Sequence, residues 1–421
     1  MRRRAARARR RRVLRVTTAG ASDGLEPARE PWSLVAVLSV TEVISWGTLY
    51  YTPTVLASHI EAGTGWRLPI VLGGYSAGIL VSGLAAPFVG RWIDAAGGRR
   101  VMAAGSALAV VALLLTAWST SVAGYYAAWG VMGLAMAATL YEAAFATLNQ
   151  HFPVHYRRAL TALTLLSGLA STVFWPVTYA LAGAYGWRTT LVCFAALHAA
   201  VCLPLHAWGI PRAGDWRQRL AAAAAGVAAP PITPPRRRVV VLLASAFALN
   251  SLVTTGVLTQ LTRLLAATGL TAAQAVGLAA LLGPMQVTGR VLEFVFATRL
   301  TAVRLALLAL GALPLALLVL AFGGGGLATA VLFVMLLGLS NGVMTIVRGL
   351  VPASLFGRER LATVLGLLAA PTLGARAAAP LVIALLVASF TGPRGVLLVL
   401  AALAATAIAA FVASTTVDGG R

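Results

Sequence analysis

Long apolar stretches separated by short polar turns run through almost the whole chain. A helix needs about 20 apolar residues to cross the hydrocarbon core of a bilayer. We predict spans at 33–58, 69–93, 101–118, 122–149, 159–184, 189–210, 239–266, 272–297, 303–322, 327–353, 361–390 and 395–415. The pattern therefore predicts an all-α membrane protein with twelve transmembrane helices.

One long polar connection divides the predicted spans into six and six. It covers 211–238 and contains Ala-rich and Pro-rich stretches and an arginine cluster, so we interpret it as a cytoplasmic linker. The predicted organisation is a disordered, Arg-rich cytoplasmic tail at 1–31, six-helix bundles at 32–210 and 239–415, and a cytoplasmic tail at 416–421. Two equal halves are typical of carriers that rock around a binding site at the membrane midplane.

The composition supports a membrane protein, because 59% of the residues are hydrophobic and only 10% are charged. Soluble domains carry about 25% charged residues. All 33 basic residues are arginines, and ten of them lie in the first 30 residues. With both termini in the cytoplasm, 26 arginines lie inside, three lie outside and four lie in spans, which satisfies the positive-inside rule. We expect a multi-pass protein of a bacterial cytoplasmic (inner) membrane.

Several functional classes are not expected. The basic tail can contact anionic lipid or remain solvated, and outside it the charge lies in short loops, which argues against nucleic-acid binding. No Walker loop is present, since that motif needs a lysine, so ATP is not expected to drive transport. Cys193 and Cys202 lie nine residues apart in one span, which excludes a disulfide framework or a zinc cluster. We expect no enzyme, no cofactor and no metal, and a protein that functions as a monomer in the lipid bilayer.

A loop motif follows the second predicted span. It reads Gly90-Arg-Trp-Ile-Asp94-Ala-Ala-Gly97-Gly98-Arg99-Arg100. Gly90 permits close helix packing, Asp94 can stabilise a neighbouring helix N-terminus, and the arginines hold the loop in the cytoplasm. The motif resembles the signature loop of the major facilitator superfamily, with Ala95 in place of the usual basic residue. The resemblance covers about residues 32 to 415 and implies that superfamily's fold and secondary transport.

Within the superfamily, the fourth and fifth spans lack the buried arginine and the glycine-proline-glycine cluster of drug-efflux carriers. Three stretches resemble the oxalate/formate antiporter and monocarboxylate transporter branch. They are Trp46-Gly47-Thr-Leu-Tyr50-Tyr51, Gly289-Arg290 and Pro371-Thr-Leu-Gly374-Ala-Arg376. This resemblance implies alternating-access transport of a small organic anion, with a carboxylate as the expected class. The alternatives are proton-driven efflux of a neutral or cationic xenobiotic and a transporter-like sensor.

Ionisable residues inside a span are costly and mark function by default. Arg376 lies about fifteen residues into its span, near the midplane, and a guanidinium fork suits carboxylate oxygens. Arg376 and Arg290 are therefore candidate substrate ligands, although Arg290 can instead pair with Glu293, three residues further on. Candidate cavity-lining aromatic residues are Tyr50, Tyr51, Tyr141 and Trp175, for which plain packing is the alternative.

Glu42 and Glu142 are candidates for proton coupling or gating, because a carboxylate in a semi-dry cavity can carry a proton. Each can instead tie two helices together. Glu142 and Arg348 lie at similar predicted depths and can pair when the cytoplasmic gate is shut, and Glu293 joins this gating set. His198 and His206 lie in the sixth span, where we expect a structural role.

Overall fold

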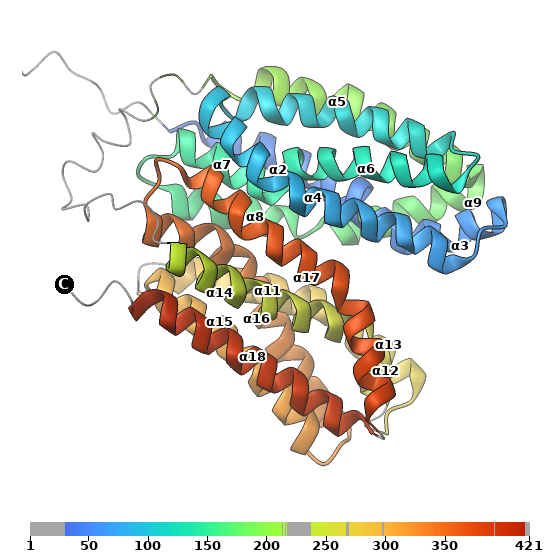
Figure 1. The fold of residues 1–421 in the computed structure, drawn as a ribbon, viewed down its shortest axis with the longest axis vertical. Coiled ribbons are helices and arrows are strands. Elements are labelled where there is room, and N and C mark those ends of the chain that lie inside the picture. Colours follow the sequence, from blue (N-terminus) through green and yellow to red (C-terminus); the bar gives the residue numbers. More distant parts are fainter. Residues whose placement is uncertain are drawn as a thin grey trace, which may run out of the picture. The chain divides into compact units, whose positions relative to one another are not determined.

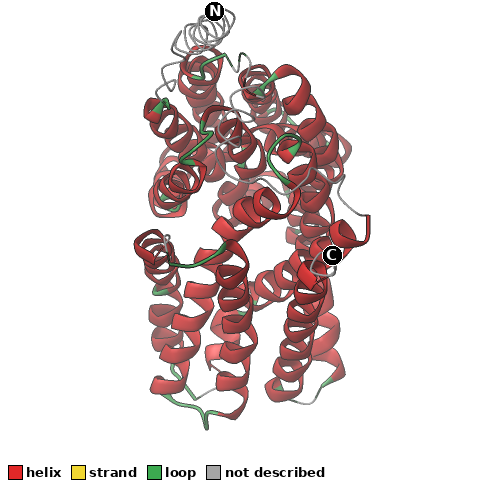
Figure 2. Ribbon diagram, turned by 90° about the vertical axis from the view of Figure 1, so that its left-hand side faces the viewer, coloured by secondary structure: helices red, strands yellow, loops and turns green. Residues whose placement is uncertain are grey.

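The structure is a computed structural model that describes residues 30–212, 214, 216, 237–266, 269–296, 299–390 and 392–416. Residues 1–29, most of the predicted linker and residues 417–421 lie outside the described residues. Contacts separate Met1–Pro31 from Trp32–Arg421, and all helices below belong to the second unit. Figure 2 shows helices joined by short loops throughout the described residues.

The first half of the described chain is helical and is called the N-terminal group. Its elements are α2 (Trp32–Ser45), η1 (Trp46–Tyr51), α3 (Thr52–Thr64), α4 (Leu68–Ala96), α5 (Gly98–Ala117), α6 (Val122–Thr139), α7 (Tyr141–His151), α8 (Tyr156–Ser167), α9 (Ala170–Leu197), η2 (His198–Cys202) and η3 (Leu205–Gly209). The three η elements are π-helical segments.

The second half is called the C-terminal group. Its elements are α11 (Arg237–Thr259), α12 (Leu261–Ala266), α13 (Ala272–Ala280), α14 (Leu282–Phe296), α15 (Ala302–Phe322), α16 (Leu327–Phe356), α17 (Leu361–Ser389) and α18 (Pro393–Thr416). Figure 1 shows the two groups as the blue-to-green and yellow-to-red halves of the ribbon.

Ten helical runs of the described residues are long and apolar enough to cross a membrane. One of them, Tyr156–Gly209, has 54 residues and contains Gly186 with φ 78° and ψ 165°, a conformation that separates two helices. The short helices α13 and α14 together cover the predicted span at 272–297. If the 54-residue run counts as two spans and the α13–α14 pair counts as one more, the total agrees with the twelve predicted spans.

Helix irregularities concentrate in the N-terminal group. The first span becomes π-helical at Trp46, and Thr52 donates its hydroxyl to the Gly47 carbonyl across this segment at 3.0 Å. The fourth span breaks at Leu140, whose ψ of −172° ends α6 and starts α7. By contrast, α16 and α17 are continuous over 30 and 29 residues. π-helical segments and broken helices often occur at functional sites because they re-aim side chains.

The two groups pack tightly at the end where α4 turns into α5, called here the Asp94 end. A Cβ at Gly90 of α4 would collide with the carbonyl oxygen of Ala362 of α17, and one at Gly366 would collide with that of Ala86. Small residues thus let the α4 and α17 backbones touch, as predicted for Gly90. The opposite end, where α3 turns into α4, is called the Gly65 end.

The buried hydrophobic clusters differ between the Asp94 end and the Gly65 end. At the Asp94 end, Leu34 and Phe152 of the N-terminal group belong to the same buried cluster as Ile346 and Leu361 of the C-terminal group. At the Gly65 end each group has a cluster of its own, one including Tyr125 and the other built only from residues after 250. The groups therefore share a core at the Asp94 end, on the left of Figure 1.

Candidate functional site

Aromatic side chains gather around the π-helical segment η1. The ring of Trp46 lies 4.7 Å from Tyr50, 6.0 Å from Tyr51 and 4.8 Å from Tyr141, measured between centroids. The first span supplies three of these rings and the start of α7 supplies the fourth. The three tyrosines that the sequence singled out therefore lie together, and Trp46, quoted only as part of a motif, joins them.

Trp175 extends this aromatic cluster along α9. Its ring lies 6.2 Å from Tyr51, and 48% of the side chain is exposed. It lines a hollow of about 570 Å³ together with Val55, Ser171, Thr172, Pro176 and Tyr179. On the other side of the cluster, Tyr75 of α4 lies 5.8 Å from Tyr50. The N-terminal group thus offers aromatic surface beside an open space.

Arg376, on α17, faces this cluster from the C-terminal group. It lies within Coulombic range of Tyr51 and Tyr75 of the N-terminal group and of Arg348 of its own group. Its side chain is half-buried, and it makes no hydrogen bond or ion pair with any described residue. A guanidinium inside a membrane protein without a partner is a strong candidate ligand for an anion.

Arg348, on α16, is the second arginine near the cluster. Its Nη2 donates to the hydroxyl of Ser251 at 2.6 Å, while its buried Nε has no hydrogen-bond partner. Glu142 lies within Coulombic range, but the two side chains form no ion pair in this structure. The pair expected for a closed cytoplasmic gate is therefore absent here, and Ser251 takes the place of Glu142.

Arg290, on α14, crosses to the N-terminal group instead of pairing with Glu293. Its Nη1 donates to the Thr164 carbonyl in the last turn of α8 at 2.6 Å. A Cβ at Gly168 would collide with the same nitrogen, so the glycine makes room for the guanidinium. The C-terminal carbonyls of a helix carry partial negative charge, which favours a cation at this position. Its Nε is buried without a partner, and only 5% of the residue is exposed.

Glu42, on α2, is completely buried. Its Oε2 accepts a hydrogen bond from Nε1 of Trp46 at 2.9 Å, and its Oε1 has no partner. Coulombic interactions link it to Glu142, which lies in the first turn of α7. The positive end of the α7 dipole favours a carboxylate at Glu142. Two carboxyl groups therefore lie at the edge of the aromatic cluster.

Glu293 ties the two groups together through the N-terminal group's α8. Its Oε1 lies 2.8 Å from both Nε and Nη2 of Arg157, and its Oε2 accepts from the Thr161 hydroxyl at 2.7 Å. Arg157 also donates to the Leu300 carbonyl at 2.6 Å. The Glu293 side chain is fully buried and that of Arg157 is 23% exposed. This ion pair, with one hydrogen bond from Nε, joins α8 to α14 at the Asp94 end.

The signature loop joins the groups at a second point. Asp94 Oδ2 accepts from the Thr363 backbone N–H at 2.8 Å and from its hydroxyl at 2.6 Å, in the first turn of α17. Asp94 therefore lies at the N-terminus of α17 and accepts hydrogen bonds there, as predicted for a neighbouring helix. Gly97 ends α4 with φ 85°, a conformation that favours glycine. Arg99 and Arg100 form no hydrogen bond or ion pair with the described residues, so their role stays a prediction.

The family follows from the sequence. The sequence model of the Major Facilitator Superfamily matches residues 34–350. The chain belongs to this superfamily. None of the curated proteins matches the sequence. Members of the superfamily are transporters, so the protein is a multi-pass membrane transporter rather than an enzyme.

Solved structures of the superfamily show the same fold. The crystal structure of the human organic anion transporter MFSD10 (TETRAN) is 19% identical, with a TM-score of 0.69 over 91% of this chain and 99% of that chain. The proton:xylose symporter XylE, solved with 6-bromo-6-deoxy-D-glucose, is 14% identical, with a TM-score of 0.65 over 90% of this chain and 94% of that chain. At these identities the likeness concerns the fold alone.

A third tie between the halves of this superfamily member was not predicted. Arg358 donates from Nε to Oδ1 of Asn149 at 2.6 Å and from Nη1 to the Pro153 carbonyl at 2.7 Å. Asn149 in turn donates to the Arg358 carbonyl at 2.7 Å. Sequence reasoning assigned Arg358 only to a cytoplasmic loop, because its partners lie about 200 residues away. No local signal points to them.

Proposed function

We propose that the protein is a secondary carrier that moves a small organic anion, most simply a carboxylate, by alternating access. The observation that carries this proposal is Arg376, a half-buried guanidinium between the two groups with no partner among the described residues. Leaving such a charge unpaired inside a membrane is costly, so a bound anion that neutralises it stabilises the protein. Its planar fork can hold both oxygens of one carboxylate.

The distribution of charge supports an anion over a cation. The C-terminal group contributes Arg290, Arg348 and Arg376, whereas the N-terminal group contributes Glu42 and Glu142. None of these arginines pairs with either glutamate in the structure, and Glu293 is taken by Arg157. Efflux of a neutral or cationic xenobiotic, the alternative, would need Glu293, Glu142 and Glu42 to neutralise these three arginines. The resemblance to the oxalate/formate and monocarboxylate branch, and the description of MFSD10 as an organic anion transporter, point to the same substrate class.

The remaining residues complete a proposed mechanism. Tyr50, Tyr51, Tyr141 and Trp175 frame the anion's carbon skeleton, and the hollow beside Trp175 has room for a small organic body. Arg290 acts as second anion ligand once it leaves the α8 carboxyl end. Glu142 and Glu42 carry a coupling proton or gate the site. The Arg157–Glu293 pair and the Asp94–Thr363 contact hold the Asp94 end shut, which is the cytoplasmic end in the predicted topology of a bacterial inner-membrane protein.

The test is thermal stabilisation of the purified protein by a panel of monocarboxylates, dicarboxylates, neutral solutes and lipophilic cations. A ligand at a hundred times its Kd stabilises the folded state by about 2.7 kcal/mol. We expect a carboxylate to stabilise the wild type and the control variant Arg394→Gln, but not Arg376→Gln. Arg394 is an exposed arginine at the second position of α18. Stabilisation by lipophilic cations alone would replace the anion proposal with xenobiotic efflux.

A further inference from the structure

A buried polar seam runs between the first and sixth spans of the N-terminal group. On the sixth span the seam residues recur every four positions and share one helix face, whereas on the first span they recur every three positions and wind around the helix. The set is Ser39, Glu42, Ser45 and Thr48 on the first span and His198, Cys202 and His206 on the sixth, with Thr48 in contact with His198. None of these residues is more than 4% exposed. Both helices are π-helical where they carry Thr48 and the His198–Cys202 pair.

The hydrogen bonds of Thr48 define the protonation of His198. The Thr48 hydroxyl donates its one proton to the Ile44 carbonyl at 2.7 Å. The contact between Thr48 Oγ1 and His198 Nε2, at 2.8 Å, must therefore be donated by the imidazole. A neutral His198 protonated on Nε2 leaves Nδ1 as a bare acceptor, and this nitrogen is buried without a partner.

His206 repeats this arrangement at the other end of the seam. Its Nδ1 lies 3.2 Å from the Met102 carbonyl and 2.7 Å from the Ser106 hydroxyl. A carbonyl only accepts, so Nδ1 carries the proton and Nε2 is the bare acceptor, again buried without a partner. Two histidines in one seam thus each keep an empty acceptor nitrogen.

The same seam holds further unsatisfied atoms. Oε1 of Glu42 and the hydroxyl oxygens of Ser39 and Ser45 are also buried without partners. Ser45 lies next to the Cys202 thiol and Glu42 lies within Coulombic range of it, one turn along the sixth span from His198. Native interiors satisfy most buried polar atoms, so a run of unsatisfied ones needs an explanation. A metal ion is not that explanation, because no three His, Cys, Asp or Glu side chains of the described residues are placed to share one.

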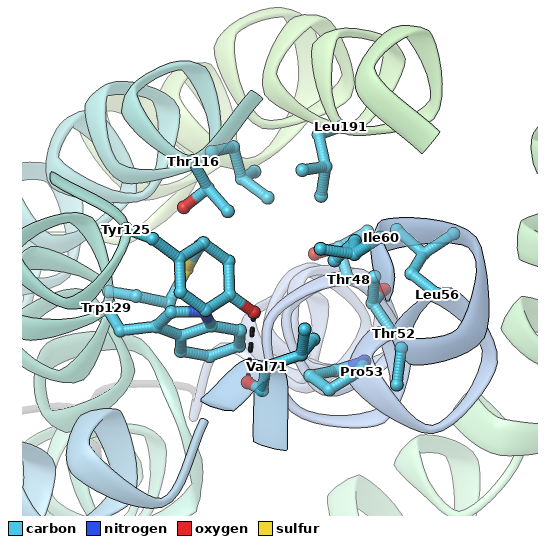
Figure 3. Close-up of a pocket in the computed structure, with 13 residues that line it drawn as sticks. Thr48, Thr52, Pro53, Leu56, Ile60, Val71, Thr116, Tyr125, Trp129 and Leu191 are labelled. Atoms are coloured by element: carbon cyan, nitrogen blue, oxygen red, sulfur yellow. Dashed lines mark hydrogen bonds between the residues drawn. The ribbon is translucent and has the colours of Figure 1, made fainter. Parts of the chain in front are cut away.

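A small cavity adjoins the seam at Thr48. Its volume is about 20 Å³, enough for one water molecule, and its walls include Thr48, Thr52, Thr116 and Trp129 (Figure 3). Nε1 of Trp129 is buried and has no acceptor. The Thr116 hydroxyl donates to the Ala112 carbonyl at 2.8 Å and so keeps its oxygen lone pairs. A water molecule in this cavity would accept from Trp129 and donate to the threonine oxygens, which would explain the unpartnered indole.

We propose that this seam conducts the coupling proton of the carrier, with Glu42 as its proton-binding group and His198 as its relay. Oε1 of Glu42, the Ser45 hydroxyl and Nδ1 of His198 lie beyond hydrogen-bonding distance of one another, so water between them carries the proton of a protonated Glu42 to the bare Nδ1 of His198. The resulting imidazolium loses the Nε2 proton to the Thr48 oxygen, and Thr48 passes one proton to the cavity water. One proton enters and one leaves, and the reverse transfer restores the tautomer. The titratable groups within Coulombic range of Glu42 are Glu142, Tyr141 and Cys202.

This inference deepens the proton-coupling part of the proposed function, and it is tested without any substrate. The purified protein is reconstituted in vesicles, and infrared difference spectra are recorded across a pH titration. We expect the wild type to show the carbonyl band of a protonated carboxylic acid, and we expect this band to be absent in Glu42→Gln. Transfer into D2O then gives the rate at which this carboxyl group exchanges its proton.

We expect the exchange to slow by roughly 100-fold in His198→Gln, whose amide still donates to Thr48 but cannot take up a proton. Thr48→Val, nearly isosteric, should slow it as well and serves if the histidine variant does not fold. Matched controls are His59→Gln and Thr406→Val, whose side chains bond only carbonyls of their own helices. Two results would overturn the proposal. One is that Glu42→Gln removes no carboxyl band from the wild-type spectrum, and the other is that proton exchange is unchanged in both His198→Gln and Thr48→Val. Neither result affects the stabilisation test at Arg376.

Discussion

The two halves of the molecule contribute opposite chemistry to the space between them. The N-terminal group places tyrosines, tryptophans and two carboxyl groups on helices interrupted by π-helical turns and by the break at Leu140. The C-terminal group places three arginines on α14, α16 and α17, the last two of which run without a break. In the proposed mechanism this difference becomes a division of work, in which one half supplies positive charge for the anion and the other supplies carboxyl groups for the proton.

The largest expected effect comes from removing the unpartnered charge of the C-terminal group. Arg376→Gln should weaken anion binding by roughly 10- to 100-fold, because hydrogen bonds to charged groups contribute about 1.5–3 kcal/mol. Arg376→Lys should retain part of the affinity, since it keeps the charge and loses the fork. Isothermal titration with the anion found in the panel measures both. Equal affinity in wild type and Arg376→Gln would remove the charge assignment.

The next effect concerns the contact that holds the halves together. Gly90→Ala should lower the free energy of unfolding by about 1–3 kcal/mol, because the new methyl group meets the Ala362 carbonyl. Gly130→Ala is the matched control, since a Cβ there has nothing within 4 Å. Thermal unfolding of both variants in the same detergent tests this. Similar destabilisation of the two would mean that the α4–α17 approach is not the cause.

Breaking the charged tie between the halves should shift their equilibrium more mildly. Glu293→Gln removes the ion pair with Arg157 but keeps an acceptor for Thr161, so we expect roughly a tenfold loss of the form closed at the Asp94 end, or about 1.4 kcal/mol. Distances between spin labels at positions 91 and 360, both exposed, report this population. Arg304→Gln, outside the tie, is the control. An unchanged distance distribution would argue against a gating role for the pair.

The smallest expected effect concerns Glu142. In vesicles loaded with the identified anion, Glu142→Gln should slow uptake driven by a pH gradient by roughly threefold to tenfold while exchange of anion for anion continues. A carboxyl group that carries the proton is needed only for net transport. If uptake and exchange decline equally, Glu142 acts on the gate or on folding.

The fold was largely predictable because its determinants are local along the chain. Apolar stretches long enough to cross a bilayer predict the helices within a few residues, as at Ala302–Phe322 against the expected 303–322. The role of Asp94 was also predictable, since the motif specifies both a close-packing glycine and a carboxylate at one helix end. The side-chain partners were harder. Arg290 and Glu293, three residues apart on one helix, offered a pair with each other as the alternative to a substrate role for Arg290, yet both bond to α8 instead.

The sequence by itself determined the membrane-embedded helical class, the family and the set of charges that the bilayer forces into use. Only the tertiary structure decided how those charges are satisfied. Arg290 lies against the end of α8, Glu293 pairs with Arg157, and Arg376 is left without a partner among the residues that the structure describes. It also placed His198 against Thr48 of the first span and His206 against Ser106 of α5. The physical reason is that helix formation depends on near neighbours and the bilayer, whereas pairing of polar side chains depends on residues more than a hundred positions apart.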